Sequence, residues 1–126
     1  MEHPKELLQK LEKLEGLFGA YAPEAYSFVL RALDFTVAKL LKARHVSGKE
    51  LLGGIREYGI KEFGPMALSV FEHWGVRSTL DFGQIVFNLV ESGLLRKRDE
   101  DVIDDFKSVY DFKDAFSVKF EFQDET

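Results

Sequence analysis

The sequence predicts a mainly α protein of the α+β class, a compact helical domain of five to six helices with a small two-stranded antiparallel ribbon. Helix starts with capping chemistry recur through the middle of the chain, where apolar residues follow helical spacing. A short segment near the C-terminus instead alternates polar and apolar residues, the pattern of a half-buried strand. At 91–98 a helix end, a glycine and then apolar and basic residues follow one another, which gives the chain a loose likeness to a winged-helix domain. The length of 126 residues predicts a single domain spanning residues 1–126.

Composition restricts the class further. Hydrophobic residues make up 45% of the chain and charged residues 31%, as in an ordinary globular protein, and twelve phenylalanines predict an aromatic core. No apolar run approaches the length of a membrane span, and residues 1–6 lack the basic and then apolar order of a signal peptide. The absence of cysteine excludes disulfides, thiolate metal sites and cysteine nucleophiles. We therefore expect a cytoplasmic protein that does not associate with a membrane.

Two helices are expected in the first third of the chain. Residues 1–20 form an N-terminal amphipathic helix whose apolar face packs either on the core or on a second subunit. Pro23 opens the longest helix, which is expected to run to about Arg44. Because this helix is apolar on two faces, it should be enclosed by neighbours and form the centre of the domain.

Three helix starts organise the middle of the chain. Ser47 and Glu50 match a capping box, in which each residue satisfies a backbone N–H of the other. Pro65 suits the first position of a second helix, because a proline lacks the N–H that would have no partner there. Ser78 or Thr79 caps a third helix.

Three glycines fall inside the first of these helices. Gly53, Gly54 and Gly59 each cost about 1 kcal/mol relative to alanine in a helix, so they imply a compensating gain. We expect the close approach of another backbone, that of the central helix at Ala25 or Ala32.

The C-terminal part of the chain supplies the predicted ribbon. Residues 99–110 predict a short acidic helix and residues 111–116 one further turn. Residues 117–122 alternate as a strand does, and residues 123–126 form a tail. Because the backbone groups of a strand need partners, we expect pairing with residues 94–97. Pairing with the same segment of another subunit is the alternative.

Four motifs occur in order along the chain. They are AYSFV at 25–29, HVSGKELL at 45–52, FGPMA at 63–67 and DFGQIVFNLVESGL at 81–94. Together they resemble a short bacterial family that is described as largely restricted to planctomycetes and verrucomicrobia. Tyr110-Asp111-Phe112 and Ala115-Phe116 also fit the C-terminal pattern of that family. The resemblance therefore spans residues 21–116 and defines a family-like core. That family has no assigned activity, so the resemblance implies no catalytic, cofactor-binding or metal-binding residues.

The residues themselves predict no such site either. His45 and His73 lie 28 residues apart, and no other metal-type ligand stands at helical spacing from either. The DFG triplet at 81–83 occurs without the glycine-rich loop and catalytic-loop motif of a kinase. The acids at 99–104 lack the glycine and the closing glutamate of a calcium loop. We expect no cofactor and no enzyme, because no nucleophile–base pair emerges.

The leading hypothesis is a non-catalytic protein-interaction module, whose partner is an unidentified protein or a second copy of the chain. The net charge is −5, and residues 99–126 hold ten acidic and three basic residues, which favours a basic protein partner over a phosphate backbone. The acids of Asp99–Asp105 form one candidate patch, and Phe87 is either an exposed anchor or packs under the N-terminal helix. The candidate basic patch consists of Arg77, Arg96, Lys97 and Arg98.

A winged-helix-like nucleic-acid-binding protein is the alternative hypothesis. Gln84 and Asn88 on the third helix could read adenine edges, supported by the basic patch. That helix carries no Arg or Lys, however, and Asp81 and Glu91 would face phosphates.

Overall fold

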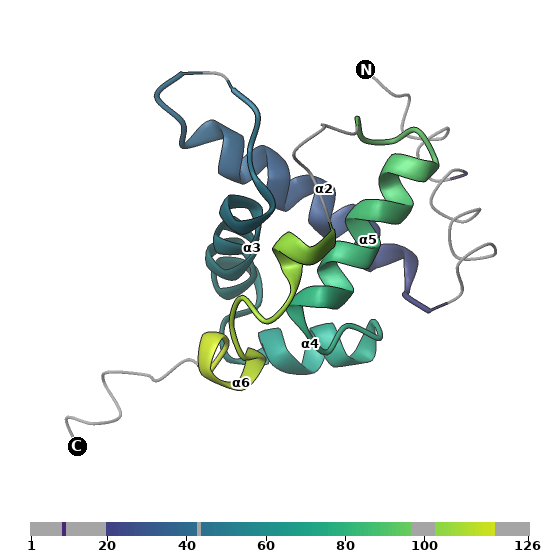
Figure 1. Cartoon of the computed structure of the whole chain (residues 1–126). Helices are drawn as coiled ribbons and strands as arrows, with labels where there is room; N and C mark the ends of the chain where they lie inside the picture. The colour runs from purple at the N-terminus through teal and green to yellow at the C-terminus, as the bar shows by residue number, and fades with distance from the viewer. Residues whose placement is uncertain (1–8, 10–19, 43, 97–102, 118–126) are drawn as a thin grey trace.

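Four α-helices of seven residues or more build the part of the chain that the computed structural model describes, which comprises residues 9, 20–42, 44–96 and 103–117. The elements, in order, are α2 (Pro23–Ala38), α3 (Gly48–Phe63), the 3-10 turn η1 (Gly64–Met66), α4 (Ala67–His73), α5 (Thr79–Glu91), the 3-10 turn η2 (Ile103–Phe106) and the one-turn helix α6 (Phe112–Ala115) (Figure 1). The predicted N-terminal helix at 1–20 falls almost entirely outside these residues, as does the tail at 123–126.

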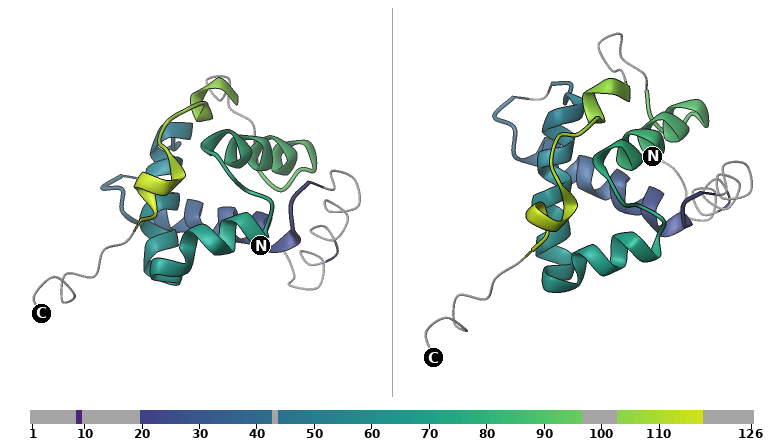
Figure 2. Two further views of the ribbon diagram at one scale, coloured as in Figure 1. Left: turned by 90° about the horizontal axis from the view of Figure 1, so that it is seen from below. Right: turned by 60° about the horizontal axis from the view of Figure 1, so that its bottom comes forward.

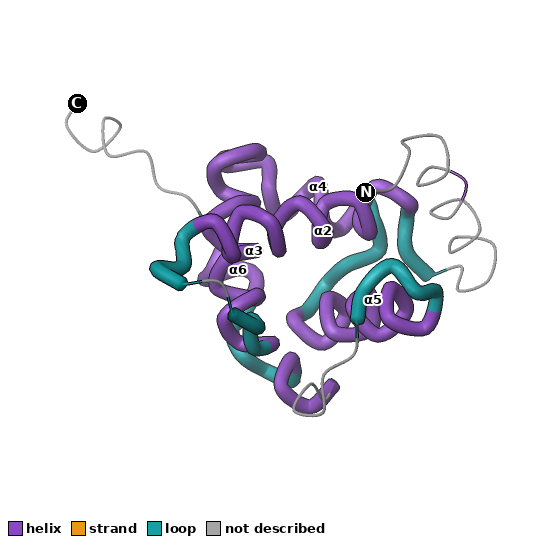
Figure 3. Tube along the Cα trace, turned by 90° about the horizontal axis from the view of Figure 1, so that it is seen from above, coloured by secondary structure: helices purple, strands orange, loops and turns teal. Residues whose placement is uncertain are grey.

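The predicted ribbon and the count of five to six helices are wrong for the described residues, which contain no strand (Figure 3). Leu94 and Leu95 turn away after α5, and the N–H groups of both donate to the carbonyl of Leu89 at 2.9 and 3.2 Å. These groups therefore close the end of a helix and do not pair with a strand. Of the second predicted strand only Ser117 is described, and it is not in a strand. The likeness to a winged-helix domain therefore has no support.

Helix α2 is central, as predicted, because it packs against both α3 and α5 (Figure 1). It ends at Ala38, however, and not near residue 44. The Lys39 N–H donates to the carbonyls of Thr36 and Val37, so the last turn tightens and the chain leaves the helix although apolar residues continue.

The predicted caps are confirmed where the structure describes them. Both hydrogen bonds of the capping box between Ser47 and Glu50 are present at the start of α3. Ser78, and not Thr79, caps α5 by accepting from the Asp81 N–H. Each cap satisfies backbone donors that have no partner inside the helix.

An aromatic core fills the space between the helices. Phe71 of α4 is fully buried at its centre, and its ring centroid lies 4.9 to 6.1 Å from those of six other aromatic residues. These partners are Phe28, Phe63, Trp74, Phe82, Phe112 and Phe116. The segment from η2 to α6 covers the core by running across α3 and α5 (Figure 2). Tyr110 in this segment donates from its hydroxyl to the carbonyl of Leu52 at 2.8 Å.

The glycine prediction is partly wrong. A Cβ at Gly54 would lie 1.7 Å from Oγ1 of Thr36, so α2 does approach here, but at Thr36 and not at either predicted alanine. Gly59 instead makes room for the ring of Phe71, since a Cβ there would lie 2.9 Å from that ring. Gly53 has open space around it.

Candidate functional site

A cavity of about 220 Å³ opens at the N-terminal end of α3, between α2, α5 and η2. We call this cavity, with the side chains around it, the α3 groove. Its wall is apolar and consists of Leu33, Val37, Val46, Leu51, Val86, Leu95 and Phe106. Its rim carries the polar residues Arg44, His45, Ser47 and Arg96.

Two glycines allow the floor of the groove to form. A Cβ at Gly48 would lie 2.9 Å from the ring of Phe106, and a Cβ at Gly83 would lie 2.6 Å from the Cβ of the same residue. Neither distance is compatible with a larger residue unless Phe106 moves. Glycines on α3 and α5 therefore let Phe106 pack between the two helices, where it is 5% exposed.

Helix geometry supplies the rest of the apolar wall. Leu33 and Val37 are four residues apart on α2, so they lie on one face of it. Val86 faces them from α5, and the turn after that helix brings Leu95 alongside. Val37 is 39% exposed, which leaves this wall open to solvent on the α2 side.

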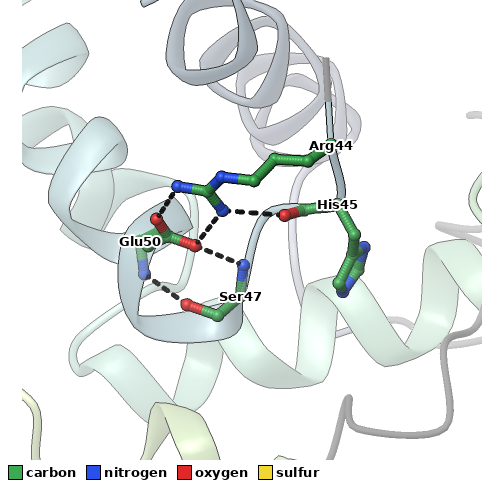
Figure 4. Close-up of polar contacts among 4 residues, drawn as sticks. All are labelled: Arg44, His45, Ser47 and Glu50. Atoms are coloured by element: carbon green, nitrogen blue, oxygen red, sulfur yellow. Dashed lines mark hydrogen bonds and ion pairs between the residues drawn. The ribbon is translucent and has the colours of Figure 1, made fainter. Parts of the chain in front are cut away.

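An ion pair holds one side of the rim in a fixed geometry (Figure 4). Nη1 and Nη2 of Arg44 donate to the two carboxylate oxygens of Glu50 at 3.0 and 2.6 Å, and Nη1 also donates to the His45 carbonyl at 3.0 Å. The same carboxylate accepts from the Ser47 N–H at 3.0 Å, while Ser47 Oγ accepts from the Glu50 N–H at 3.2 Å. The pKa of the Glu50 carboxylate is lowered to about 2, mainly by the hydrogen bond from Arg44 and next by the hydrogen bond from the Ser47 N–H. The side chain of His45 points away from this cluster (Figure 4).

Arg96 differs from Arg44. It is exposed on the rim after α5, and among the described residues no carboxylate pairs with it. Its charge is therefore available to a ligand, whereas the guanidinium of Arg44 is already engaged by Glu50.

Of the predicted basic patch, the structure describes Arg77 and Arg96 alone, and these two do not lie together. Arg77 precedes α5 and Arg96 follows it, at opposite ends of a helix of thirteen residues that is about 20 Å long. The backbone N–H of Arg77 donates to the Asp81 carboxylate at 2.8 Å. Lys97 and Arg98 lie outside the described residues, as do positions 99–102 of the predicted acidic patch.

The two residues predicted to read bases belong to an internal network. Asn88 is 1% exposed, and its Nδ2 donates to the Tyr26 hydroxyl at 2.9 Å. Its Oδ1 accepts from Nε2 of Gln84 at 3.0 Å. Burial raises the pKa of the Tyr26 hydroxyl, and the hydrogen bond from Asn88 opposes this. Asn88 therefore does not lie on a surface that a nucleic acid could reach.

Other predicted features stand apart from the groove. Phe87 is 48% exposed on α5, and Leu80, seven residues earlier on the same face, is 42% exposed. His73 is exposed in the last turn of α4. In the part of the chain that the structure describes, no three His, Asp or Glu side chains gather in a way that could hold a metal ion. No described helix is both long and apolar enough to cross a membrane.

No protein-family model, curated protein or solved structure matches the chain. The resemblance to the bacterial family therefore stays a prediction, and the proposal below rests on the geometry of the groove.

Sequence reasoning identified Arg96 but missed the groove itself. Among the groove residues, only Ser47, which caps α3 together with Glu50, could be recognised from a local sequence pattern. Gly48 and Gly83 were signals that could have indicated a close approach, since each is a glycine within a predicted helix, where glycine costs about 1 kcal/mol relative to alanine.

Proposed function

We propose that the chain is a non-catalytic protein-interaction module that binds a segment of a partner protein in the α3 groove. The segment inserts one apolar side chain between α2 and α5 and places an acidic residue against Arg96. The observation that carries this proposal is an open apolar cavity with an arginine on its rim that no described carboxylate neutralises.

The size of the groove supports a side chain as the ligand. A cavity of about 150 Å³ in another protein holds a benzene ring, and the α3 groove has about 220 Å³. One aromatic or large aliphatic side chain therefore fits with little room left over. Protein interfaces obtain most of their affinity from a few well-packed anchor side chains, while charges at the rim help to select the partner.

The rim favours binding over catalysis. The Ser47 hydroxyl is the cap of α3, and the Glu50 carboxylate pairs with Arg44. These groups therefore stabilise the helix start, and no described base lies against the serine in the arrangement that activates a nucleophile.

Selection from a random peptide library tests the proposal. The immobilised full chain should enrich peptides with an aromatic or large aliphatic residue next to Asp or Glu. Val86→Trp, which fills the groove, should abolish this enrichment, whereas Leu80→Trp, a matched change on the outer face of α5, should leave it intact. Arg96→Glu, an exposed change that leaves the core untouched, should remove the preference for acidic residues.

Two results would overturn the proposal. One is that Val86→Trp enriches the same set of peptides as the wild type, because the binding site would then lie elsewhere. The other is the absence of any enrichment by a folded wild-type chain. Binding of the wild type to duplex DNA that Arg96→Glu abolishes would instead support the nucleic-acid alternative.

A further inference from the structure

We infer that residues 4–18 of this chain lie along the outer face of α5 and cover it. The outer face of α5 is the side of the helix that carries Leu80 and Phe87, which are 42% and 48% exposed. These two residues stand seven positions apart, about 10 Å along the helix axis, and therefore share one side. Because the opposite side of α5 faces the core, the helix is apolar on both sides. A helix of this kind is expected to pack between neighbours.

The chain is fixed beside the first turn of α5 just after this segment. Tyr21 donates from its hydroxyl to the Asp81 carboxylate at 2.6 Å. The Ala22 N–H donates to the carbonyl of Trp74, shortly before α5 begins, at 3.1 Å. Residues 4–18 are therefore attached to the domain at the N-terminal end of α5. A segment that lies along α5 from this point runs antiparallel to the helix.

The leucines of the segment have the spacing that this face requires. Leu7, Leu11 and Leu14 recur at helical spacing on one side. Leu7 and Leu14 are seven residues apart, as are the two residues of the outer face. In an antiparallel pair of helices, Leu14 therefore lies against Leu80. Leu7 then lies against Phe87.

Gln9 agrees with this orientation. It is the one residue before Ala20 that the structure describes, and it is helical and exposed. Because it follows Leu7 by two positions, it lies about 160° around a helix from that leucine. Gln9 therefore marks the solvent side of the segment, and the leucines face the other way.

The tether favours this segment over a separate chain. Seven residues lead from Leu14 to Tyr21, and they span up to about 24 Å when extended. Gly16 and Gly19 within this stretch favour a helix end and a turn. A segment tethered this closely has a local concentration on the order of millimolar at the face beside it. A second copy of the chain would have to bind against that competition.

Residues 118–126 fit the outer face less well. This segment follows α6, which lies beside α3 (Figure 1). Its apolar residues alternate with polar ones and are Val118, Phe120 and Phe122. In an extended segment such side chains are about 7 or 13 Å apart, and neither spacing matches the separation of about 10 Å between Leu80 and Phe87. The sequence pattern therefore selects residues 4–18 as the occupant.

Cross-linking between introduced cysteines in the full chain tests the inference, since the chain has no cysteine of its own. Packed helices lie about 8 to 10 Å apart, which is too far for a disulfide, so the reagent is a short bismaleimide. Leu7→Cys/Phe87→Cys and Leu14→Cys/Leu80→Cys should cross-link within one chain. The matched controls are Leu14→Cys/Phe87→Cys and Leu7→Cys/Leu80→Cys, which place the same positions in the parallel register. They should react about tenfold more slowly, because each pair is displaced by about 10 Å along the helices.

The reactivity of single cysteines gives a second measurement that needs no cross-linker. Phe87→Cys should react slowly with a soluble maleimide, because residues 4–18 cover it. Met66→Cys, at a position that is 59% exposed outside this face, is the reference. Adding Leu7→Ser/Leu11→Ser/Leu14→Ser should raise the rate of Phe87→Cys by about tenfold and leave that of Met66→Cys unchanged.

A matched control changes the other side of the same segment. Lys5→Ser/Gln9→Ser/Glu12→Ser also introduces three serines and keeps the net charge. These positions lie opposite the leucines on a helix. Phe87→Cys should therefore stay slow in this variant.

Several results would overturn the inference. A cross-link between two chains in place of one within the chain would assign the outer face to a second copy. Equal rates for the antiparallel and the parallel pairs would show that the segment has no defined register on α5. A reactivity of Phe87→Cys that the leucine substitutions leave unchanged would show that the segment does not cover the face. None of these results touches the proposed function, because the peptide selection reports on the α3 groove.

Discussion

The side-chain amide of Asn88 donates a 2.9 Å hydrogen bond to the hydroxyl of Tyr26, joining α5 to α2 in the interior of the domain. Tyr26 is fully buried and Asn88 nearly so. Gln84 completes the network by donating to the other end of the same amide. A satisfied polar network of this kind fixes how two helices pack, because any other arrangement leaves buried polar groups without partners.

Removing the Tyr26 hydroxyl should destabilise the protein. Tyr26→Phe leaves an amide donor of Asn88 without its partner, at a cost of about 1 to 3 kcal/mol in the free energy of unfolding. Chemical denaturation followed by circular dichroism measures this cost. The control is Tyr58→Phe, because the hydroxyl of Tyr58 makes no hydrogen bond to the described residues. Equal stabilities of the two variants would contradict the role of the network.

Two adjacent glycines on α3 should respond to alanine in opposite directions. Gly54→Ala brings a Cβ to 1.7 Å from Oγ1 of Thr36, which itself donates to the Ala32 carbonyl at 2.7 Å. The overlap should cost about 1 to 3 kcal/mol, and Thr36→Ala should recover part of that loss. Gly53→Ala meets nothing within 4 Å and should stabilise the helix by up to about 1 kcal/mol. Thermal unfolding of both variants provides the comparison, and destabilisation by Gly53→Ala would contradict the packing.

Glu50 should make stability depend on pH in the acid range. Its carboxylate has a pKa of about 2 in the folded chain against an ordinary value of 4.5, so the folded state binds the proton less tightly than the unfolded state. The stabilisation is therefore fully present above about pH 4.5 and is lost as the pH falls from there towards 2. The melting temperature of Glu50→Gln should fall less steeply over this interval than that of the wild type. Glu62→Gln, an exposed change on the same helix, should follow the wild-type slope, and a wild-type slope for Glu50→Gln would exclude this role.

Phe71 should contribute far more to stability than an exposed phenylalanine. Phe71→Ala removes a fully buried ring that packs against six aromatic partners and should cost about 3 to 5 kcal/mol. Phe87→Ala removes a ring that is 48% exposed and should cost much less. The fluorescence of Trp74, the single tryptophan of the chain, reports unfolding directly because its ring lies 5.9 Å from that of Phe71. Similar losses in the two variants would contradict the position of Phe71 at the centre of the core.

Helix starts could be predicted from sequence because a cap depends on residues three positions apart. Ser47 with Glu50, and Ser78 with Asp81, satisfy backbone donors within one turn, so their chemistry is visible in a short window. The extent of a helix is less local. The predicted helix from Pro23 ran too far because Leu40 and Leu41 continue its apolar pattern, although the chain has already turned at Lys39.

The ribbon could not be judged from alternation alone. A strand needs a partner, and whether one exists depends on where distant segments lie. The backbone N–H groups of Leu94 and Leu95 instead donate to the Leu89 carbonyl within the same turn of chain. Sequence periodicity does not distinguish such a helix end from a strand.

The groove could not be predicted because its walls come from four separate elements. Arg96 was identified as a charged residue, but its place beside Leu33 and Val86 follows only from the packing of α2 against α5. Asn88 shows the reverse error: a polar residue on an amphipathic helix was assigned to the surface, whereas its position between α5 and α2 buries it.

The most direct test of the proposed function is two-dimensional amide NMR of the labelled full chain during titration with a peptide selected from the random library. The account predicts that the resonances that shift belong to the α3 groove, at Leu33, Val37, Leu51, Val86 and Arg96, and that Arg96→Glu weakens the titration. Shifts confined to the outer face of α5 around Leu80 and Phe87, with unchanged groove resonances, would contradict it.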